Sequence, residues 1–245
     1  MSRIFDFVLG FLYPKKCICC GERIPEDEDL CKFCRHWIER VPAEKRCAYC
    51  GLIKEHCQCD SCAYHFVEMI APFYNSGLAQ QGFYRLKFGG RRHYANFFAR
   101  EMAKAVHSEC FGVTFDAICY VPVSKKHYRQ RGFDQSELLA KELAKCLKAP
   151  LLEDAILCQF SGKTQHELSW KERFTAIRQK YRVGMPIKGR VLLVDDIKTS
   201  GATLDECARE LLFAGADEVY CATALISDPQ FQVTAEYTKE ICAKS

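Results

Sequence analysis

The sequence predicts an α/β fold with a mostly parallel sheet, preceded by a small cysteine-rich module. From Glu68 onward, apolar runs suited to strands alternate with helical patterns. Ten of the 17 cysteines lie between Cys17 and Cys62. The length of 245 residues and the 49% hydrophobic content suit one ordinary domain plus a smaller module. We therefore expect a module over residues 1–66 and a larger domain over residues 67–245.

The strands and helices of the larger domain follow from hydrophobic periodicity. The expected strands are Met69–Tyr74, Ala117–Val123, Arg190–Val194 and Glu218–Ile226. The expected helices are Tyr94–Val106, Gln135–Leu147, a short one near Ser169–Glu172, and Ala202–Phe213. Asp134 with Glu137 three residues later predicts a capping box, and Gly215 fits the end of the last helix.

Four Cys-x-x-Cys turns occur in series in the module. Such a turn presents two thiolates to one metal, and two turns complete a tetrahedral four-sulfur zinc site. Sequential pairing predicts two structural zinc ions, one on Cys17, Cys20, Cys31 and Cys34 and the other on Cys47, Cys50, Cys59 and Cys62. Closed sites of this kind leave no position for catalysis, and zinc binding would supply the folding free energy of the module.

Several alternatives to this zinc assignment stay open. Cys19 and Cys57 are left over, so an interleaved pairing, or Cys57 or His56 in place of a ligand, is compatible with the spacing. Redox thiols or disulfides are the other interpretation of a cysteine-rich segment. The seven later cysteines show no paired spacing and are expected to be buried apolar residues.

The chain shows no export signal and no membrane-spanning run. The apolar start Ile4–Leu12 is interrupted by Asp6 and is too short to span a bilayer. We expect it to form an amphipathic helix packed on the body, with docking on a membrane surface as the alternative. The protein is therefore expected to be cytoplasmic with reduced thiols. The formal charge of +4 indicates that any affinity for nucleic acid must come from local patches.

The stretch Arg190–Thr203 carries the chemistry. Four apolar residues run into Asp195 and Asp196, which therefore emerge at the carboxyl end of the sheet, where open α/β sheets bind ligands. The hydroxyl-rich turn that follows leads into a helix and suits an anion. Two carboxylates would repel a bare phosphate, but they can accept the hydroxyls of a ribose. A ribose 5-phosphate fits, with its phosphate on Thr199, Ser200, Gly201, Ala202 and Thr203.

Residues 191–203 resemble the signature with which type I phosphoribosyltransferases bind 5-phosphoribosyl-1-pyrophosphate (PRPP), with Ser200 where a second threonine is usual. The zinc knuckles, the Arg-Gly-Phe-Asp-Gln element at Arg131–Gln135 and this signature occur in the order of the ComF family, which are competence-associated, phosphoribosyltransferase-like proteins. The family more often has asparagine at the position of Asp134 and proline at that of Ser124.

The resemblance implies a type I phosphoribosyltransferase-like fold and roles for further residues. The loop after the second expected strand would face the pyrophosphate and carries Ser124, Lys125, Lys126, Arg129 and Arg131. A flap over residues 161–173 would close on PRPP, with Lys163 and Arg173 stabilising the departing pyrophosphate. Asp195 and Asp196 would hold the ribose and stabilise charge on it, with Asp196 the better candidate for proton transfer. Mg²⁺ would accompany PRPP.

Two classes of function follow from the resemblance. One is a magnesium-dependent phosphoribosyltransferase, a glycosyltransferase, that moves a 5-phosphoribosyl group to an unidentified nitrogen acceptor, linked to competence and DNA uptake. The other is a non-catalytic adaptor that senses PRPP or a nucleotide and binds single-stranded DNA or a protein of the competence machinery. The module has basic residues that favour the second class: Lys15, Lys16, Arg35, His36, Arg40, Lys45, Arg46 and Lys54.

Two acidic or basic segments bear on this choice. Glu26–Asp29 dilutes the basic character of the module. The basic and aromatic stretch Tyr84–Arg92 is interpreted as a hairpin or hood over the site in preference to a nucleic-acid surface.

Overall fold

A parallel sheet lies at the centre of the computed structural model, which describes residues 14–57, 59, 64–159 and 180–231. The strand order is β1-β7-β6-β3, and β2 also pairs with β7. All of these pairings are parallel. The strands are β1 (Met69–Ile70), β2 (Phe73–Tyr74), β3 (Ala117–Tyr120), β6 (Arg190–Lys198) and β7 (Glu218–Ile226).

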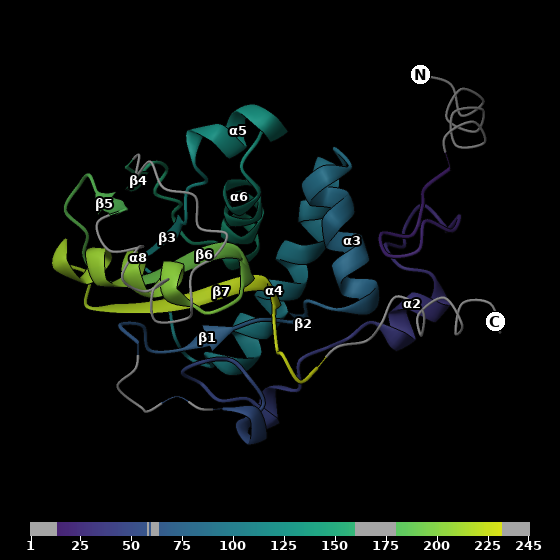
Figure 1. Cartoon of the computed structure of the whole chain (residues 1–245), viewed down its shortest axis with the longest axis horizontal. Helices are drawn as coiled ribbons and strands as arrows, with labels where there is room; N and C mark the ends of the chain where they lie inside the picture. The colour runs from purple at the N-terminus through teal and green to yellow at the C-terminus, as the bar shows by residue number, and fades with distance from the viewer. Residues whose placement is uncertain (1–13, 58, 60–63, 160–179, 232–245) are drawn as a thin grey trace.

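Helices cover both faces of this sheet. Figure 1 shows α8 in front of the sheet and α4 and α6 behind it. The long helices are α3 (Gly77–Phe88), α4 (Ala95–Glu109), α6 (Gln135–Leu147) and α8 (Ala202–Phe213). Shorter elements are α2 (Lys32–Trp37), α5 (Lys125–Arg131), the 3-10 turns Ala43–Lys45, Lys54–His56 and Arg92–Tyr94, and an antiparallel pair of β4 (Ile156–Cys158) and β5 (Tyr181–Val183).

The two faces of the sheet bury two separate hydrophobic cores. On β6, Leu192 and Val194 pack into the core of α3, α4 and α6, whereas Val191 and Leu193 pack into the core of α8. This alternation is the period of two that a strand requires. Because both faces are covered, β6 and β7 are apolar along most of their length.

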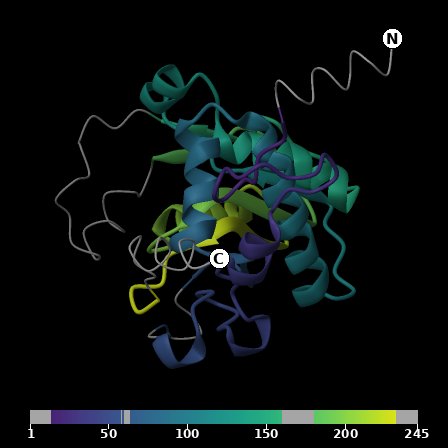
Figure 2. The ribbon, with the colours of Figure 1, turned by 90° about the vertical axis from the view of Figure 1, so that its right-hand side faces the viewer.

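Each half of the cysteine-rich segment adds to a different core. Ile18, Leu30 and Ile38 join the core of α3, α4 and α6, whereas Phe66 belongs to the core of α8 and Leu52 packs against it. In Figures 1 and 2 the segment passes from beside α3, in purple, to below β1, in blue. The two halves therefore contact opposite faces of one sheet.

The first half also fixes helix α3. The Arg85 guanidinium donates to the carbonyl oxygens of Cys17 and Ile18 at 3.4 Å and of Cys20 at 3.1 Å. At the other end of α3, the Glu39 carboxylate accepts the backbone N–H groups of Leu78 and Ala79, each at 3.0 Å. A carboxylate at a helix N-terminus satisfies free donors and complements the helix dipole.

Most of the predicted elements are present, with shifted ends. Pro72 separates the expected strand 69–74 into β1 and β2, and β6 continues four residues past Val194. The predicted helices 135–147 and 202–213 are confirmed, and the Asp134 carboxylate accepts the N–H groups of Ser136 and Glu137 as the capping pattern indicated. The expected N-terminal helix, the short helix near Ser169 and the flap lie outside the described residues.

The hairpin expected over Tyr84–Arg92 is wrong, because residues 77–88 form the helix α3. The glycines at 77 and 82 made a helix hard to predict here. A Cβ at residue 82 would lie 3.1 Å from the Ile18 side chain and 3.3 Å from Cys19 Sγ. Glycine at position 82 thus lets α3 pack closely against the segment around the first cysteine cluster, Cys17 to Cys34, which we call the first ribbon. Of the described helices, none has the length and apolar character needed to cross a membrane.

Replacement of Gly77 by alanine is predicted to lower the free energy of unfolding by about 2–3 kcal/mol. Gly77 has φ +48°, and a Cβ there would overlap the Glu39 carboxylate that caps α3. Gly90→Ala is the control, since Gly90 has φ +66° but no atom within 4 Å of the new Cβ. It should cost only about 1 kcal/mol. Equal losses for the two variants in urea unfolding would contradict the role given to Glu39.

Candidate functional site

The two carboxylates of β6 lie side by side in sequence but have different partners. Asp195 Oδ1 accepts the Ser136 hydroxyl at 2.9 Å and the Asp196 N–H at 2.8 Å. Burial, and then the neighbouring charge of Asp196, raise the pKa of Asp195 to about 8. Asp195 is thus a carboxyl that can hold or release a proton near neutral pH.

Asp196 is paired with a lysine from another element. Lys87 Nζ, at the C-terminal end of α3, lies 2.5 Å from Asp196 Oδ2. Both side chains are only 15% exposed. Desolvation of both partners strengthens their attraction but makes it costly to leave either one alone. Helix α3 thus contacts both the first cysteine cluster, through Arg85, and the adjacent carboxylates Asp195 and Asp196 (the diacid), through Lys87.

Sequence reasoning missed both Ser136 and Lys87 as site residues. Lys87 is 109 residues from Asp196 in sequence, and only its membership of a basic segment distinguished it. Ser136 stands in the first turn of α6 next to the capping aspartate, a place where serine is common for local reasons. Long-range pairing is not visible in one sequence.

The predicted anion loop connects β6 to α8. Gly201 has φ +81° and immediately precedes Ala202, the first residue of α8. Ser200 Oγ accepts the Ala202 N–H at 3.4 Å. The loop thus leads into the N-terminus of a 12-residue helix, where N–H groups and the helix dipole favour an anion. Thr199 to Thr203 are contiguous at this position, beyond the carboxyl end of β6.

The predicted pyrophosphate loop follows β3, the neighbour of β6 in the sheet. Ser124 caps α5 by accepting the His127 N–H at 3.4 Å, so Lys125 and Lys126 begin a helix rather than an extended loop. Among the described residues, the next acidic side chains in sequence have other partners: Asp134 accepts the N–H groups of Val123, Ser136 and Glu137, and Glu137 and Glu142 pair with lysines of α6. The charges of α5 are available at the same edge of the sheet as the diacid.

The arginines of this segment divide between two places. Arg131 donates to Gln135 Oε1 at 2.9 Å, and its guanidinium lies 5.3 Å from the centre of the Phe88 ring on α3. Arg129 and Lys125 instead border a cavity of about 290 Å³. The other residues that line it are Tyr120, Pro122, Val123, Tyr128, Asp134, Glu137 and Asp154. Neither Asp195 nor Asp196 borders that cavity. Arg131 therefore contacts α3, whereas Arg129 and Lys125 line a cavity that the two carboxylates do not reach.

Lys163 and Arg173, the predicted stabilisers of pyrophosphate, lie outside the described residues.

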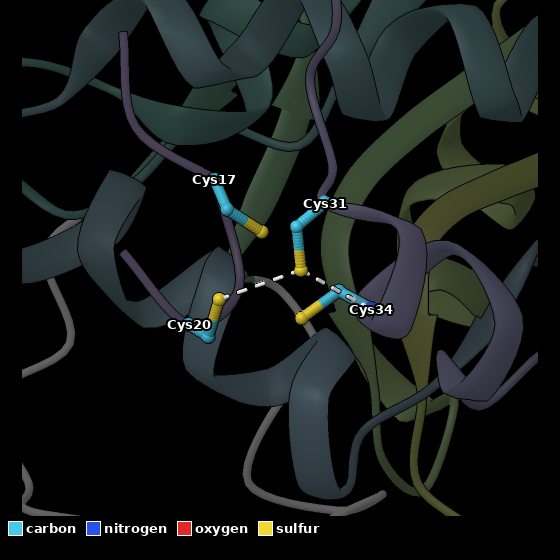
Figure 3. A group of neighbouring side chains, drawn as sticks. All are labelled: Cys17, Cys20, Cys31 and Cys34. Atoms are coloured by element: carbon cyan, nitrogen blue, oxygen red, sulfur yellow. Dashed lines mark hydrogen bonds between the residues drawn. The ribbon is translucent and has the colours of Figure 1, made fainter. Parts of the chain in front are cut away.

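The first predicted zinc site is assembled as expected. The ligand atoms of Cys17, Cys20, Cys31 and Cys34 all lie within 4.8 Å of one another, and Figure 3 shows the four sulfurs pointing toward one point. Cys20 Sγ and Cys31 Sγ are 3.7 Å apart. Tetrahedral zinc with Zn–S bonds of about 2.3 Å requires S–S separations of about 3.8 Å. These four thiols therefore fit structural zinc.

The second cluster contains Cys47, Cys50, Cys57 and Cys59, with all ligand atoms within 4.8 Å of one another. Cys47 Sγ and Cys59 Sγ are 3.7 Å apart, and Cys50 Sγ and Cys57 Sγ are 3.5 Å apart. These two separations are close to the value that tetrahedral zinc requires, whereas Cys57 Sγ and Cys59 Sγ are closer together, at 3.1 Å. Cys57 is the fourth thiol of this cluster among the described residues, and Cys62, the fourth ligand in the sequential pairing, lies outside them. The spacing Cys57-x-Cys59-x-x-Cys62 left both choices open.

Two other residues were candidates for these sites. His56 Nδ1 lies 2.7 Å from Asp228 Oδ2, so the histidine binds a carboxylate. Cys19 is fully buried in the core with α3 and contacts Cys17 and Cys34, but it is not one of the four clustered thiols.

Known proteins are similar to this chain over both regions. The model of the double zinc ribbon domain matches residues 8–69. Competence protein ComFC of Streptococcus pneumoniae (strain ATCC BAA-255 / R6) is 28% identical over 226 residues, which cover 83% of this chain and 96% of that protein. DNA utilization protein YhgH of Escherichia coli O157:H7 is 33% identical over 144 residues, or 56% of this chain. The match spans 63% of that relative, which is less than two thirds of its length.

Among solved structures, orotate phosphoribosyltransferase from Aeropyrum pernix is similar at a TM-score of 0.35 and 20% identity, over 62% of this chain and 68% of that one. A likeness of this extent carries no conclusion about activity. The clusters and the parallel sheet define a double zinc ribbon joined to an α/β domain with a mostly parallel sheet. The zinc-ribbon match and the relatives named ComFC, competence protein F and YhgH support a ComF-family protein.

The purified chain is predicted to contain two zinc ions, and Cys57→Ser should reduce this to one. The reason is that Cys57 supplies one of the four thiols of the second cluster. Cys146→Ser is the matched control and should retain two, because Cys146 is exposed and is not among the clustered ligands. Elemental analysis of the intact chain gives the stoichiometry. Two zinc ions in Cys57→Ser, together with one in Cys62→Ser, would restore the sequential pairing.

Asp195→Asn is predicted to stabilise the chain increasingly as pH rises from about 4 to about 8. The pKa of Asp195 is about 8 in the folded chain against an ordinary value of 3.8, so the folded state binds more protons across that window. Wild-type stability from this group is complete at low pH and is lost as pH rises through 8, whereas asparagine does not titrate. At pH 8.5 the variant should gain about 1 kcal/mol or more.

The measurement is urea unfolding of both chains at pH 5 and pH 8.5. Asp27→Asn, at an exposed position, is the control and should show no such trend. A difference between wild type and Asp195→Asn that is equal at both pH values would contradict the burial of this carboxyl.

Proposed function

We propose that this chain binds PRPP and transfers its 5-phosphoribosyl group to a nitrogen acceptor with release of pyrophosphate. The observation that carries the proposal is the join between β6 and α8, where a diacid and an anion loop are adjacent. A diol and a phosphate on one small ligand satisfy both features, and ribose 5-phosphate has that pattern. The ligand would lie at the carboxyl edge of the parallel sheet, as in other open α/β folds.

The contacts of the ligand follow from the residues present. The ribose hydroxyls would donate to Asp195 and Asp196, while the 5-phosphate accepts N–H groups and hydroxyls of Thr199 to Thr203. Lys87 is paired with Asp196. It would exchange that carboxylate for an oxygen of PRPP, so that its charge stays neutralised. The phosphate-rich ligand would also draw on the cations at the start of α5, which follows the adjacent strand.

The reaction is a substitution at C1′ of the ribose. The acceptor nitrogen forms a bond to C1′ as the bond from C1′ to the pyrophosphate oxygen breaks, and the pyrophosphate takes that bonding pair. Positive charge grows on the sugar, and the adjacent carboxylates stabilise it. The acceptor then loses a proton. The sequence favoured Asp196 for that proton, but the raised pKa of Asp195 favours Asp195 as the proton acceptor.

Other parts of the machinery belong to this proposal as well. Mg²⁺, bound to the pyrophosphate and the ribose hydroxyls, would neutralise charge on the leaving group. Lys163 and Arg173 would add positive charge from the flap. The two zinc sites, with four thiols each and no open position, would be structural. We place the protein in the cytoplasm, with residues 1–66 as the ribbon module and 67–245 as the phosphoribosyltransferase-like domain.

A role in DNA uptake or use is supported by the names of the relatives, which are called competence and DNA utilization proteins. The same names favour a second candidate, an adaptor that binds PRPP without transferring its phosphoribosyl group. Its zinc ribbons would contact single-stranded DNA or a competence protein. Contacts to DNA phosphates through the basic residues of the ribbons would weaken steeply with salt.

Calorimetric titration of the intact chain with PRPP and Mg²⁺ tests the proposal, paired with pyrophosphate release across candidate nitrogen acceptors. The Asp195→Asn/Asp196→Asn double variant should weaken PRPP binding by about 100-fold, since it loses two charge-assisted contacts to the ribose. Asp217→Asn is the control, because that exposed residue precedes β7 at the opposite edge of the sheet. It should bind as the wild type does.

Three outcomes separate the candidates. Tight binding with acceptor-dependent release of pyrophosphate supports the enzyme. Tight binding without release, joined to salt-sensitive binding of single-stranded DNA, supports the adaptor. No binding of PRPP by the zinc-loaded wild type, or full binding by the double variant, would overturn the site itself.

A further inference from the structure

Tyr64, which follows the second cysteine cluster (Cys47 to Cys59, the second ribbon) in sequence, contacts the anion loop. The Tyr64 hydroxyl donates to the Ser200 carbonyl oxygen at 3.3 Å. A Cβ at Gly201 would lie 3.2 Å from Tyr64 Cε1, so the ring packs closely against the loop backbone. The Tyr64 ring in turn stacks on Phe66, with centroids 4.7 Å apart. Phe66 is buried in the core of α8, which holds Tyr64 in place.

The residue after Tyr64 binds the helix that follows the loop. The backbone N–H of His65 donates to Asp205 Oδ1 at 2.6 Å, and the His65 ring Nδ1 lies 3.0 Å from the same oxygen. Asp205 stands in the first turn of α8. The segment after the second cluster is therefore bonded to both sides of the Gly201 turn.

The side chain of Lys198 makes a second contact with the loop, at Gly201. Lys198 is the last residue of β6, only 3% exposed, and its Cε lies 3.2 Å from the position of a Cβ on Gly201. The stem thus supports the loop. Burial lowers the pKa of the Lys198 ammonium, and the nearby Cys50, Cys59 and Asp228 oppose that shift. Asp228 is itself held by His56 of the second ribbon. A buried cation between a loop and a thiol cluster connects the two.

Zinc in the second cluster would strengthen this connection. Four thiolates around one Zn²⁺ leave about two negative charges at the site, and a buried ammonium is a suitable counterion. Without the metal, neither the position of the four thiols nor their charge is fixed. The contacts of Tyr64 and Lys198 with the loop at Ser200 and Gly201 would then be weakened.

We propose that zinc in the second cluster positions the PRPP loop through Tyr64 and Lys198, so that zinc retention and PRPP binding are coupled. This rests on the proposed function, because it assumes that the loop binds the 5-phosphate. Tyr64 and Lys198 are positioning residues, since they act on the loop backbone and need not touch the ligand. Coupling of two binding events is reciprocal, so PRPP must retain zinc to the extent that zinc favours PRPP.

The test measures the equilibrium partition of zinc between the intact wild-type chain and a chromophoric chelator, with and without saturating PRPP and Mg²⁺. The zinc that belongs to the second site is assigned with Cys59→Ser, which removes one of its ligands. PRPP should raise the zinc affinity of that site by about fivefold or more, the usual range for coupled sites. Calorimetry on the same samples records whether PRPP is bound.

Two conservative variants probe the proposed connection. Tyr64→Phe keeps the ring but loses the bond to Ser200, and it should weaken PRPP binding by about two- to tenfold. Lys198→Met keeps the stem but loses the ammonium, and it should abolish most of the effect of PRPP on zinc release. Tyr49→Phe and Lys188→Met, at exposed positions in the second ribbon and ahead of β6, are the matched controls and should behave as wild type.

The outcomes distinguish this inference from the proposed function. PRPP binding by the wild type with unchanged equilibrium release of zinc to the chelator would overturn the coupling and leave the PRPP site intact. The coupling is also overturned if Tyr64→Phe and Lys198→Met retain both the PRPP affinity and the full effect on zinc release. Absence of PRPP binding by the zinc-loaded wild type would overturn the proposed function and, with it, the coupling.

Discussion

The docking of the two cysteine clusters against the sheet is the constraint on which the rest of this structure depends. A segment with so few aliphatic residues cannot bury enough apolar surface to fold by itself, so metal and the adjacent sheet must stabilise it. The segment in turn supplies contacts that the domain lacks. Arg85 donates to the carbonyls of the first knuckle, and Glu39 caps the helix on which Arg85 stands.

The proposed ligand site has two halves, and each half is connected to a different cysteine cluster. The diol half contains Asp196, which reaches the first ribbon through Lys87 and α3. The phosphate half contains Ser200, whose carbonyl is held by Tyr64 after the second ribbon. A zinc-binding segment at the start of the chain can therefore influence a site formed near its end. This explains in physical terms why structural zinc and a PRPP site would occur in one protein.

The sequence predicted those parts of the site in which residues close in the chain act together. The diacid, the turn at Gly201 and the helix start all lie within one short stretch, and the Cys-x-x-Cys turns are local as well. Parallel strands with both faces buried were visible as apolar runs. The helix α3 was not predicted, because Gly82 lowers the helix propensity of this segment. The glycine allows close packing on Ile18, a contact that the sequence does not show. Contacts between distant residues, such as Lys87 with Asp196, leave no mark in a single sequence.

The central claim is that one ligand joins the diacid to the anion loop, and a structure of the zinc-loaded chain with PRPP and Mg²⁺ tests it most directly. The ribose hydroxyls should lie within hydrogen-bond distance of Asp195 and Asp196, the 5-phosphate on the amides of Thr199 to Thr203, and Lys87 should have left Asp196 for a ligand oxygen. PRPP bound instead in the cavity beside Tyr120, with the pair of Lys87 and Asp196 intact, would contradict the claim.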